Sequence, residues 1–184
     1  MESPSISPQT NAEISAATAE VWQQIHDYCS GLEEEKFFAK PAPEVWSVAE
    51  NLEHLFIGTK AVVKALGVPK IALRSFGKPN REGRSYQEVV QRYQERLAAL
   101  DGPVKQGDYA PKVDPQMEVA SFLEKWESIG QKYRERIESW SEDDLDKYLL
   151  PHPLLGKMLV REMLFFTVYH SYHHLKIMHD RIDG

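Results

Sequence analysis

The sequence predicts an all-α protein: a four-helix bundle with a short extra helix between its second and third long helices. Apolar residues recur at the 3.6-residue period of an amphipathic helix in four long segments. No segment shows a convincing alternation of apolar and polar residues, which is typical of strands, and no repeat of about 20–50 residues is present. The long connection between the second and third helices indicates a topology other than a plain up-down meander.

The first helix is predicted from an apolar stripe that follows a polar N-terminal segment. Residues 1–10 are rich in Ser and Pro, which predicts a disordered tail, and residues 11–184 are predicted to form one domain. Pro41 and Pro43 end the first helical region, because proline cannot continue a helix. The stripe consists of Ile14, Ala17, Val21, Ile25, Tyr28 and Leu32.

The second helix and the short extra helix each begin with a capping box. Ser47 with Glu50 opens the second helix, and Gly67 with Pro69 ends it. Ser85 with Glu88 opens the extra helix, which the run 101–103 (Asp-Gly-Pro) closes. Residues 68–84 and the segment up to residue 115 are predicted loops. The stripe of the second helix consists of Val48, Leu52, Leu55, Thr59, Val62, Val63 and Leu66.

The third long helix precedes a polar break at Ser141 and a rigid connection at residues 151–156 (Pro-His-Pro-Leu-Leu-Gly). The last helix is predicted from about Lys157 to about Asp180. The stripe of the third helix consists of Val119, Phe122, Trp126, Ile129, Tyr133, Ile137 and Trp140.

Composition bounds the function classes. The net charge of −6 and the pI of about 5.7 argue against general nucleic-acid binding, which needs a basic face. The single cysteine, Cys29, has no internal disulfide partner and is predicted to pack as a small hydrophobe rather than act as a nucleophile. No signal peptide and no apolar stretch long enough for a bilayer is apparent, so a cytoplasmic protein without membrane contact is expected.

Three histidines form the candidate site. His170 and His174 are four residues apart and therefore lie one turn apart on the same face of a helix. Such a pair can reach a single metal ion. With His54 as a third ligand, one coordination position stays open, which is typical of catalytic rather than structural zinc. The alternative interpretation is that these histidines are hydrogen-bonded groups packed at helix interfaces.

The surroundings of His54 predict a cavity. At helical spacing, His54 is followed by Gly58, Ala61 and Ala65. Close-packed interfaces are normally filled by larger side chains, so this face is expected to form one wall of a cavity. His152, in its proline-framed loop, is either an ordinary packing residue or a residue near the mouth of that cavity.

Other residues are assigned supporting roles. Asn51 and Phe166 are predicted to line the pocket or support the ligands, Phe166 because it precedes His170 by one turn. His173 points about 100° away from its neighbour and is expected beside the site rather than on the metal. Glu50, one turn before His54, is the candidate for catalytic proton transfer; the alternative is that it only caps its helix.

Three motifs together resemble the DinB/YfiT-like metalloenzyme superfamily. They are residues 46–55 (Trp-Ser-Val-Ala-Glu-Asn-Leu-Glu-His-Leu), residues 151–156, and residues 170–174 (His-Ser-Tyr-His-His), in the order of that family. The resemblance implies a bundle in up-down-down-up order and a homodimer. It further implies a divalent metal ion, zinc or nickel, held by His54, His170 and His174. Ile177 departs from the family pattern, in which glutamine is common at that position, so the resemblance does not assign a substrate.

Three functions follow as hypotheses. The first is a metal-dependent thiol S-transferase, whose partners are a low-molecular-weight thiol and a small electrophile, with no nucleic acid. The second is a metal-dependent hydrolase that uses water. The third is a non-enzymatic, stress-related binding module in which the metal only stabilises the fold.

Overall fold

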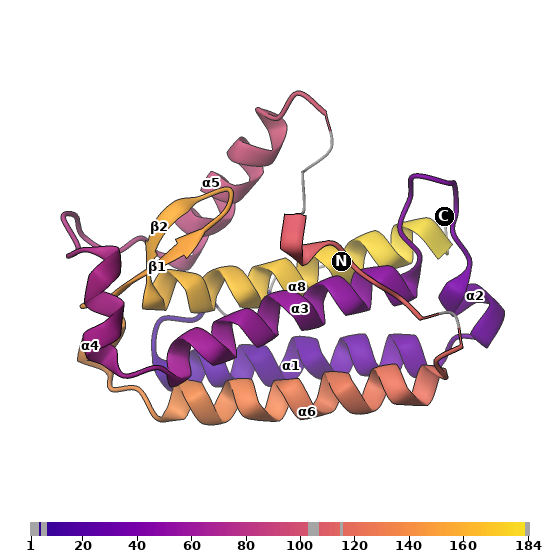
Figure 1. Ribbon diagram of the computed structural model, residues 1–184, viewed down its shortest axis with the longest axis horizontal. Coiled ribbons are helices and arrows are strands. Elements are labelled where there is room, and N and C mark those ends of the chain that lie inside the picture. Colours follow the sequence, from indigo (N-terminus) through magenta and orange to yellow (C-terminus); the bar gives the residue numbers. More distant parts are fainter. Residues whose placement is uncertain (1–3, 5–6, 103–106, 115, 183–184) are drawn as a thin grey trace.

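The computed structural model describes residues 4, 7–102, 107–114 and 116–182. Within these residues, four long helices run side by side, as Figure 1 shows: α1 (Asn11–Ser30), α3 (Val48–Gly67), α6 (Val119–Glu138) and α8 (Val160–Ile182). α1 and α8 run in one direction, and α3 and α6 run in the other. α1 and α3 each pack against both α6 and α8, so they lie on a diagonal of the bundle. The predicted up-down-down-up bundle is confirmed.

The predicted capping boxes set the starts of two helices. At the start of α3, the Ser47 hydroxyl accepts a hydrogen bond from the Glu50 backbone N–H, and the Glu50 carboxylate accepts one from the Ser47 backbone N–H. Ser85 and Glu88 do the same at the start of α5 (Tyr86–Ala98). A further box, formed by Thr10 and Glu13, opens α1 and was not predicted. Each box satisfies backbone donors that the first turn of a helix leaves unpaired.

The α1–α6 half of the bundle is a dense aromatic core. The rings of Trp22 and Trp126 are stacked with centroids 4.3 Å apart, and Trp126 donates its indole N–H to the Trp22 carbonyl. Gly130 makes this stack possible, because a Cβ at that position would lie 2.3 Å from the Trp22 ring. Tyr133, two turns after Trp126 on α6, also stacks on Trp22. The stacked rings therefore fill the interface between α1 and α6.

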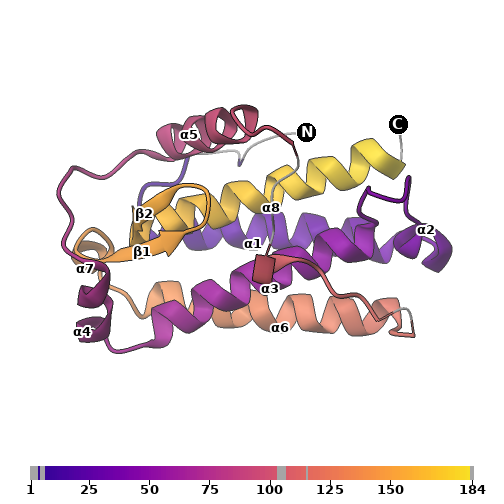
Figure 2. The same cartoon turned by 45° about the horizontal axis from the view of Figure 1, so that its top comes forward.

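Short elements connect the long helices. The segment before α5 contains α4 (Lys70–Leu73) and η1 (Arg74–Phe76), and the segment after it contains η2 (Gly107–Tyr109). α2 (Glu34–Phe38) follows α1, and α7 (Glu142–Leu145) follows α6. The sequence predicted loops where α4, η1 and η2 lie, and a polar break where α7 lies. α5 is the expected extra helix, and it packs across α8 on the outside of the bundle (Figure 2).

A small β-hairpin precedes α8 and was not predicted. β1 (Leu149–His152) pairs antiparallel with β2 (Gly156–Leu159), with His152 opposite Gly156. Both strands are edges, where proline is tolerated, and the sequence predicted only a rigid connection at residues 151–156. Gly156 adopts a φ of +75°, which glycine accepts without strain, and the chain turns there. α8 consequently begins at Val160, three residues later than expected.

Of the predicted N-terminal tail, residues 1–3, 5 and 6 lie outside the described residues. Pro8 is buried, and the Gln9 carbonyl accepts a hydrogen bond of 2.7 Å from Arg161. Among the described helices, none is both long and apolar enough to cross a bilayer.

A buried carboxylate fixes the entry to α5. Glu162 is fully buried and accepts two hydrogen bonds from the guanidinium of Arg81, one of them 2.6 Å long. It also accepts the backbone N–H groups of Arg84, at 2.8 Å, and Leu159, at 3.2 Å. Burial raises the pKa of Glu162, but the hydrogen bonds from Arg81 and Arg84 outweigh it, so the pKa lies below its ordinary value.

Glu162→Gln is expected to lower the free energy of unfolding at neutral pH by about 3 kcal/mol, because it leaves Arg81 without its buried partner. The pKa of Glu162 is lowered in the folded state, so the carboxylate stabilises the fold above its unfolded pKa. That stabilisation is lost as the pH falls through the folded pKa. Urea unfolding of both proteins at neutral and falling pH measures the difference, which should shrink in acid.

Asp180→Asn is the matched control, since Asp180 forms an exposed ion pair with Lys176. It should leave stability nearly unchanged. A Glu162→Gln effect that stays constant down to acidic pH would contradict the assignment of an ionised carboxylate.

Candidate metal centre

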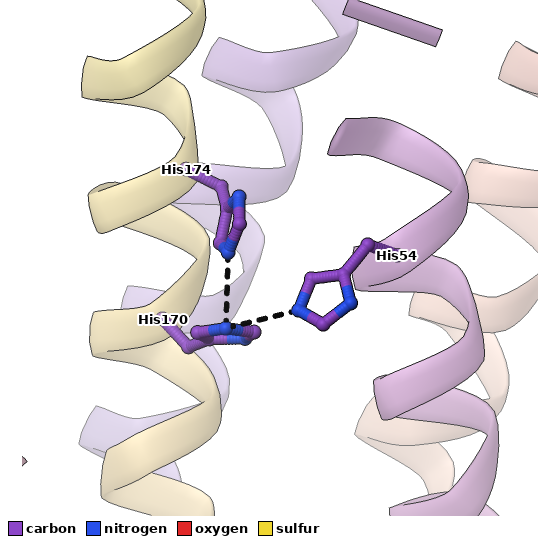
Figure 3. A group of neighbouring side chains, drawn as sticks. All are labelled: His54, His170 and His174. Atoms are coloured by element: carbon purple, nitrogen blue, oxygen red, sulfur yellow. Dashed lines mark hydrogen bonds between the residues drawn. The ribbon is translucent and has the colours of Figure 1, made fainter. Parts of the chain in front are cut away.

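Three histidine rings from two helices converge on one point. His54 lies on α3, and His170 and His174 lie one turn apart on α8 (Figure 3). The Nε2 atom of His170 is 3.3 Å from Nε2 of His54 and 3.1 Å from Nε2 of His174. One nitrogen of each ring can be chosen so that all three lie within 4.8 Å of one another. The structure thus brings together the three histidines that the sequence singled out.

Two of the rings are oriented by a hydrogen bond at Nδ1, the nitrogen that does not face the cluster. His54 donates its Nδ1–H to the carbonyl of Tyr109, at 2.8 Å, and His174 donates its Nδ1–H to Oδ1 of Asn51, at 2.8 Å. Both partners are oxygen acceptors, so Nδ1 carries the proton and Nε2 carries a lone pair in each neutral ring. Both lone pairs are therefore available at the point of convergence.

The orientation of the Asn51 amide is fixed independently. Its Nδ2 donates to the Ser47 carbonyl, at 2.8 Å, and to the Trp46 carbonyl, at 3.4 Å. These two acceptors require the amide nitrogen to face the start of α3, which leaves Oδ1 to face His174. The first turn of α3 therefore positions a ligand candidate on α8.

The site favours neutral imidazoles. Burial lowers the pKa of His54, and the hydrogen bond to the Tyr109 carbonyl only partly offsets this. Burial, followed by the neighbouring histidines, holds the pKa values of His170 and His174 well below their usual value. Neutral imidazole is the form that binds a metal ion.

The two nitrogen distances around His170 suit one tetrahedral ion. With zinc–nitrogen bonds of about 2.0–2.1 Å, two nitrogens on a tetrahedral zinc lie about 3.3 Å apart. The distances of 3.3 and 3.1 Å around His170 match this value. Converging lone pairs on neutral rings repel one another unless a cation or a shared proton lies between them. The residues present thus fit a divalent metal ion.

A cavity of about 270 Å³ adjoins the histidines. The three small residues of α3 that predicted it, Gly58, Ala61 and Ala65, lie in its wall. The surface of the cavity is mainly apolar, and among the described residues no Lys, Arg, Asp or Glu lines it. Phe166, also in the wall, is stacked on His170 with ring centroids 4.9 Å apart. A small, largely apolar molecule would therefore lie directly beside the ligand candidates.

Glu50 is not brought to the cluster. Its carboxylate accepts the Ser47 N–H at 2.8 Å and pairs with Lys40 at 2.9 Å, and it does not line the cavity. The alternative interpretation, a helix cap, describes its contacts. Cys29 is fully buried in the core, and burial raises the pKa of its thiol to about 12, so it is not a ready nucleophile. His173 is half-buried beside the site, its ring 5.4 Å from that of His174.

Several contacts at the site had no counterpart in the sequence reasoning. The Tyr109 carbonyl comes from η2, a backbone group in a predicted loop, and no side-chain pattern signals it. The Trp46 ring lies over His54, with centroids 5.0 Å apart. Tyr93 of α5 reaches Phe166 and His170, at ring distances of 5.2 and 6.1 Å. His152 lines the cavity, as its proline-framed loop suggested.

Two proteins are similar to this chain. The chain is 23% identical to the uncharacterized protein YuaE of Bacillus subtilis (strain 168), over 162 residues that cover 88% of this chain and 90% of YuaE. The crystal structure of the colibactin self-resistance protein ClbS in complex with a dsDNA has a TM-score of 0.55 at 16% identity. That match covers 94% of this chain and 95% of the ClbS chain, and at this identity the likeness shows a shared fold.

The ClbS complex corrects the expectation about partners. Nucleic acid was excluded on the net charge of −6, yet a protein of this fold is found on double-stranded DNA. The exclusion was wrong because net charge is a sum over the whole chain and does not describe any one face. The thiol and the small electrophile expected as partners receive no support from either similar protein.

The family follows from a longer match. The family model of the DinB superfamily matches residues 17–178, a span that includes His54, His170, His174 and Asn51. Because this match covers most of the sequence, the chain belongs to the DinB superfamily.

Proposed function

We propose that the protein is a divalent-metal-dependent enzyme that acts on a small, largely apolar molecule. His54, His170 and His174 would hold the ion, and the adjoining cavity would hold the substrate. The observation that carries this proposal is the convergence of three Nε2 atoms, two of them oriented by hydrogen bonds at Nδ1. Zinc and nickel are the candidate ions, since imidazole nitrogen suits both.

A divalent ion with three imidazole ligands lowers the pKa of a group bound in its remaining position and so supplies a nucleophile near neutral pH. The protein's own residues orient the histidine rings and enclose the cavity. Asn51 and the Tyr109 carbonyl hold two rings in the ligating tautomer, and such contacts commonly strengthen metal binding. The apolar cavity wall excludes bulk water from a substrate beside His170.

His54→Ala is expected to abolish stoichiometric metal binding, because two imidazoles on one helix cannot replace the third ligand. Asn51→Leu keeps the size of the side chain but removes the acceptor for His174, and it should weaken zinc binding by about 10–100-fold. Competition titration with a chelating indicator measures the affinity, and elemental analysis of the untagged protein measures the metal content.

His26→Ala is the control for these two variants. His26 lies on α1 and pairs with Glu127 at 3.0 Å, away from the cluster. The His26→Ala variant should bind one equivalent of metal, as the natural protein should. Equal metal content in His54→Ala and His26→Ala would remove His54 from the site and end the proposal.

Turnover tests the enzymatic part of the proposal. The zinc-loaded protein should release 4-nitrophenol from 4-nitrophenyl acetate at least about tenfold faster than His54→Ala, if it generates a nucleophile at the site. A parallel reaction with 1-chloro-2,4-dinitrobenzene, with and without added 2-mercaptoethanol, separates hydrolysis from S-transfer. Product that depends on thiol favours the transferase, and product from water alone favours the hydrolase. No metal-dependent turnover in either reaction would favour a non-enzymatic binding module.

A second candidate function is an interaction with nucleic acid along a groove between α3 and α6. We propose that the groove contacts phosphates, for two reasons. Its wall contains Lys60, Lys64, Lys125 and Lys132 but only one acidic residue, Glu124. Among the described residues, none of the four lysines has an ion-pair partner within 4.0 Å. The ClbS complex adds that this fold occurs in a protein bound to dsDNA.

The double variant K64E/K132E should weaken binding to a short DNA duplex and reduce the salt dependence of the binding constant. Each lost phosphate contact lowers the slope of log K against log salt by about 1. Fluorescence anisotropy over a range of salt concentrations measures both quantities. K36E/K78E, which makes the same change in net charge at exposed sites outside the groove, is the control. Equal losses in the two double variants would show that net charge, and not the groove, governs any binding.

A further inference from the structure

His152 is a polar residue of the cavity wall that the proposed chemistry does not use. It ends β1, and its ring contacts Phe166 with centroids 4.3 Å apart. Phe166 is in turn stacked on His170. The His152 imidazole therefore lies one aromatic ring away from the histidine cluster, in the wall of the same cavity.

The hairpin turn fixes the tautomer of His152. Its Nδ1 accepts the backbone N–H of Leu154, at 3.1 Å, and that of Leu155, at 3.0 Å. A backbone N–H can only donate, so Nδ1 carries a lone pair and the neutral ring carries its proton on Nε2. Burial lowers the pKa of His152 to about 4, so the ring is neutral at physiological pH. His152 therefore presents a neutral N–H donor.

That donor has no partner within the described part of the chain. No described residue hydrogen-bonds to Nε2 of His152, and Nε2 is not among the fully buried polar atoms that lack a partner, so it remains accessible. Two hydroxyls in the same wall are already engaged. Thr167 donates to the Met163 carbonyl at 2.9 Å, and Ser171 donates to the Thr167 carbonyl at 3.0 Å.

The cavity selects the charge of the acceptor. No charged side chain of the described residues lines the cavity, and the Phe166 ring lies between His152 and the histidines proposed to hold the metal ion. A carboxylate or phosphate beside His152 would therefore lose its hydration without a charged side chain to pair with. An uncharged oxygen needs only one good donor. At about 270 Å³ the cavity exceeds the roughly 150 Å³ that can enclose benzene, so a ring with a carbonyl substituent fits.

We propose that His152 recognises the substrate by donating a hydrogen bond from Nε2 to an uncharged carbonyl oxygen. The substrate class is then a small, largely apolar ketone, ester or amide. This inference rests on the proposed function, because it takes the cavity beside the three histidines as the substrate site. It assigns His152 a role in recognition and not in holding the metal.

Two probes of nearly equal shape test the hydrogen bond. Acetophenone carries a carbonyl group where α-methylstyrene carries a methylene group, so only the first can accept from Nε2. Binding of each probe to the zinc-loaded, full-length protein is followed by NMR titration, with histidine labelled with ¹⁵N. In the natural protein, acetophenone should shift the Nε2 resonance of His152 and α-methylstyrene should not.

Two substitutions separate the donor from the turn. His152→Asn places an oxygen near the position of Nδ1, which keeps the acceptor for Leu154 and Leu155, but it removes the Nε2–H donor. His152→Gln places an amide nitrogen near the position of Nε2, which keeps a donor, but it removes the turn acceptor. His152→Asn should therefore weaken acetophenone binding about three- to tenfold and change α-methylstyrene binding by less than about twofold. His152→Gln should keep the preference for acetophenone while it lowers thermal stability.

Equal effects of His152→Asn on both probes, or no effect on either, would overturn the inference. So would the failure of both probes to bind the natural protein at millimolar concentration. Elemental analysis of the same samples distinguishes this failure from that of the proposed function. Metal bound as in the natural protein with no probe selectivity defeats the role of His152 alone, whereas selectivity without bound metal defeats the metal-dependent function and leaves the recognition role standing.

Discussion

The hydrogen bond from His174 Nδ1 to Asn51 Oδ1 connects the two helices that carry the site, and the arrangement of the cluster depends on it. It selects the tautomer of His174, directs Nε2 toward His170, and couples α8 to the first turn of α3. Without an acceptor at position 51, a buried Nδ1–H would lack a partner, and the ring would be free to rotate. The Tyr109 carbonyl orients the His54 ring in the same way, by accepting its Nδ1–H. Two rings of the cluster are therefore oriented by hydrogen bonds at Nδ1, the nitrogen that does not face the other histidines.

This constraint gives the capping box of α3 a meaning beyond helix stability. Ser47 and Glu50 fix where α3 starts, and the backbone N–H of Asn51 then bonds to the Ser47 carbonyl as the helix begins. The Asn51 amide uses that same carbonyl to orient itself. Glu50 thus acts on the site only through the start of the helix, which explains how a residue one turn from His54 can be absent from the cavity.

Much of this arrangement could be read from the sequence, and the exceptions share one physical cause. The four amphipathic stripes, two capping boxes and the spacing of His170 and His174 are local patterns, and local patterns predicted the bundle. The Tyr109 carbonyl could not be found, because a backbone group in a loop has no side-chain signature. The hairpin around His152 was not predicted, because proline is uncommon in strands and is tolerated there mainly at sheet edges. The exclusion of nucleic acid failed because total charge does not describe any one face, and the groove between α3 and α6, for example, is lined by four lysines.

The α1–α6 half of the bundle provides a packed core, and the α3–α8 half carries the histidine cluster and the cavity. Between α1 and α6, Gly130 lets the Trp22 ring approach the α6 backbone and stack on Trp126. Between α3 and α8, Gly58, Ala61 and Ala65 have the opposite effect: no large side chain fills the space beside them, and a cavity remains. Small residues at a helix interface thus either admit a neighbouring ring or leave a cavity, and the facing helix decides which. Among the α8 residues that line this space are Phe166 and His170, whose rings stack on each other. The dense half keeps the helices in register, so that the open half can hold three imidazoles and a cavity without collapse.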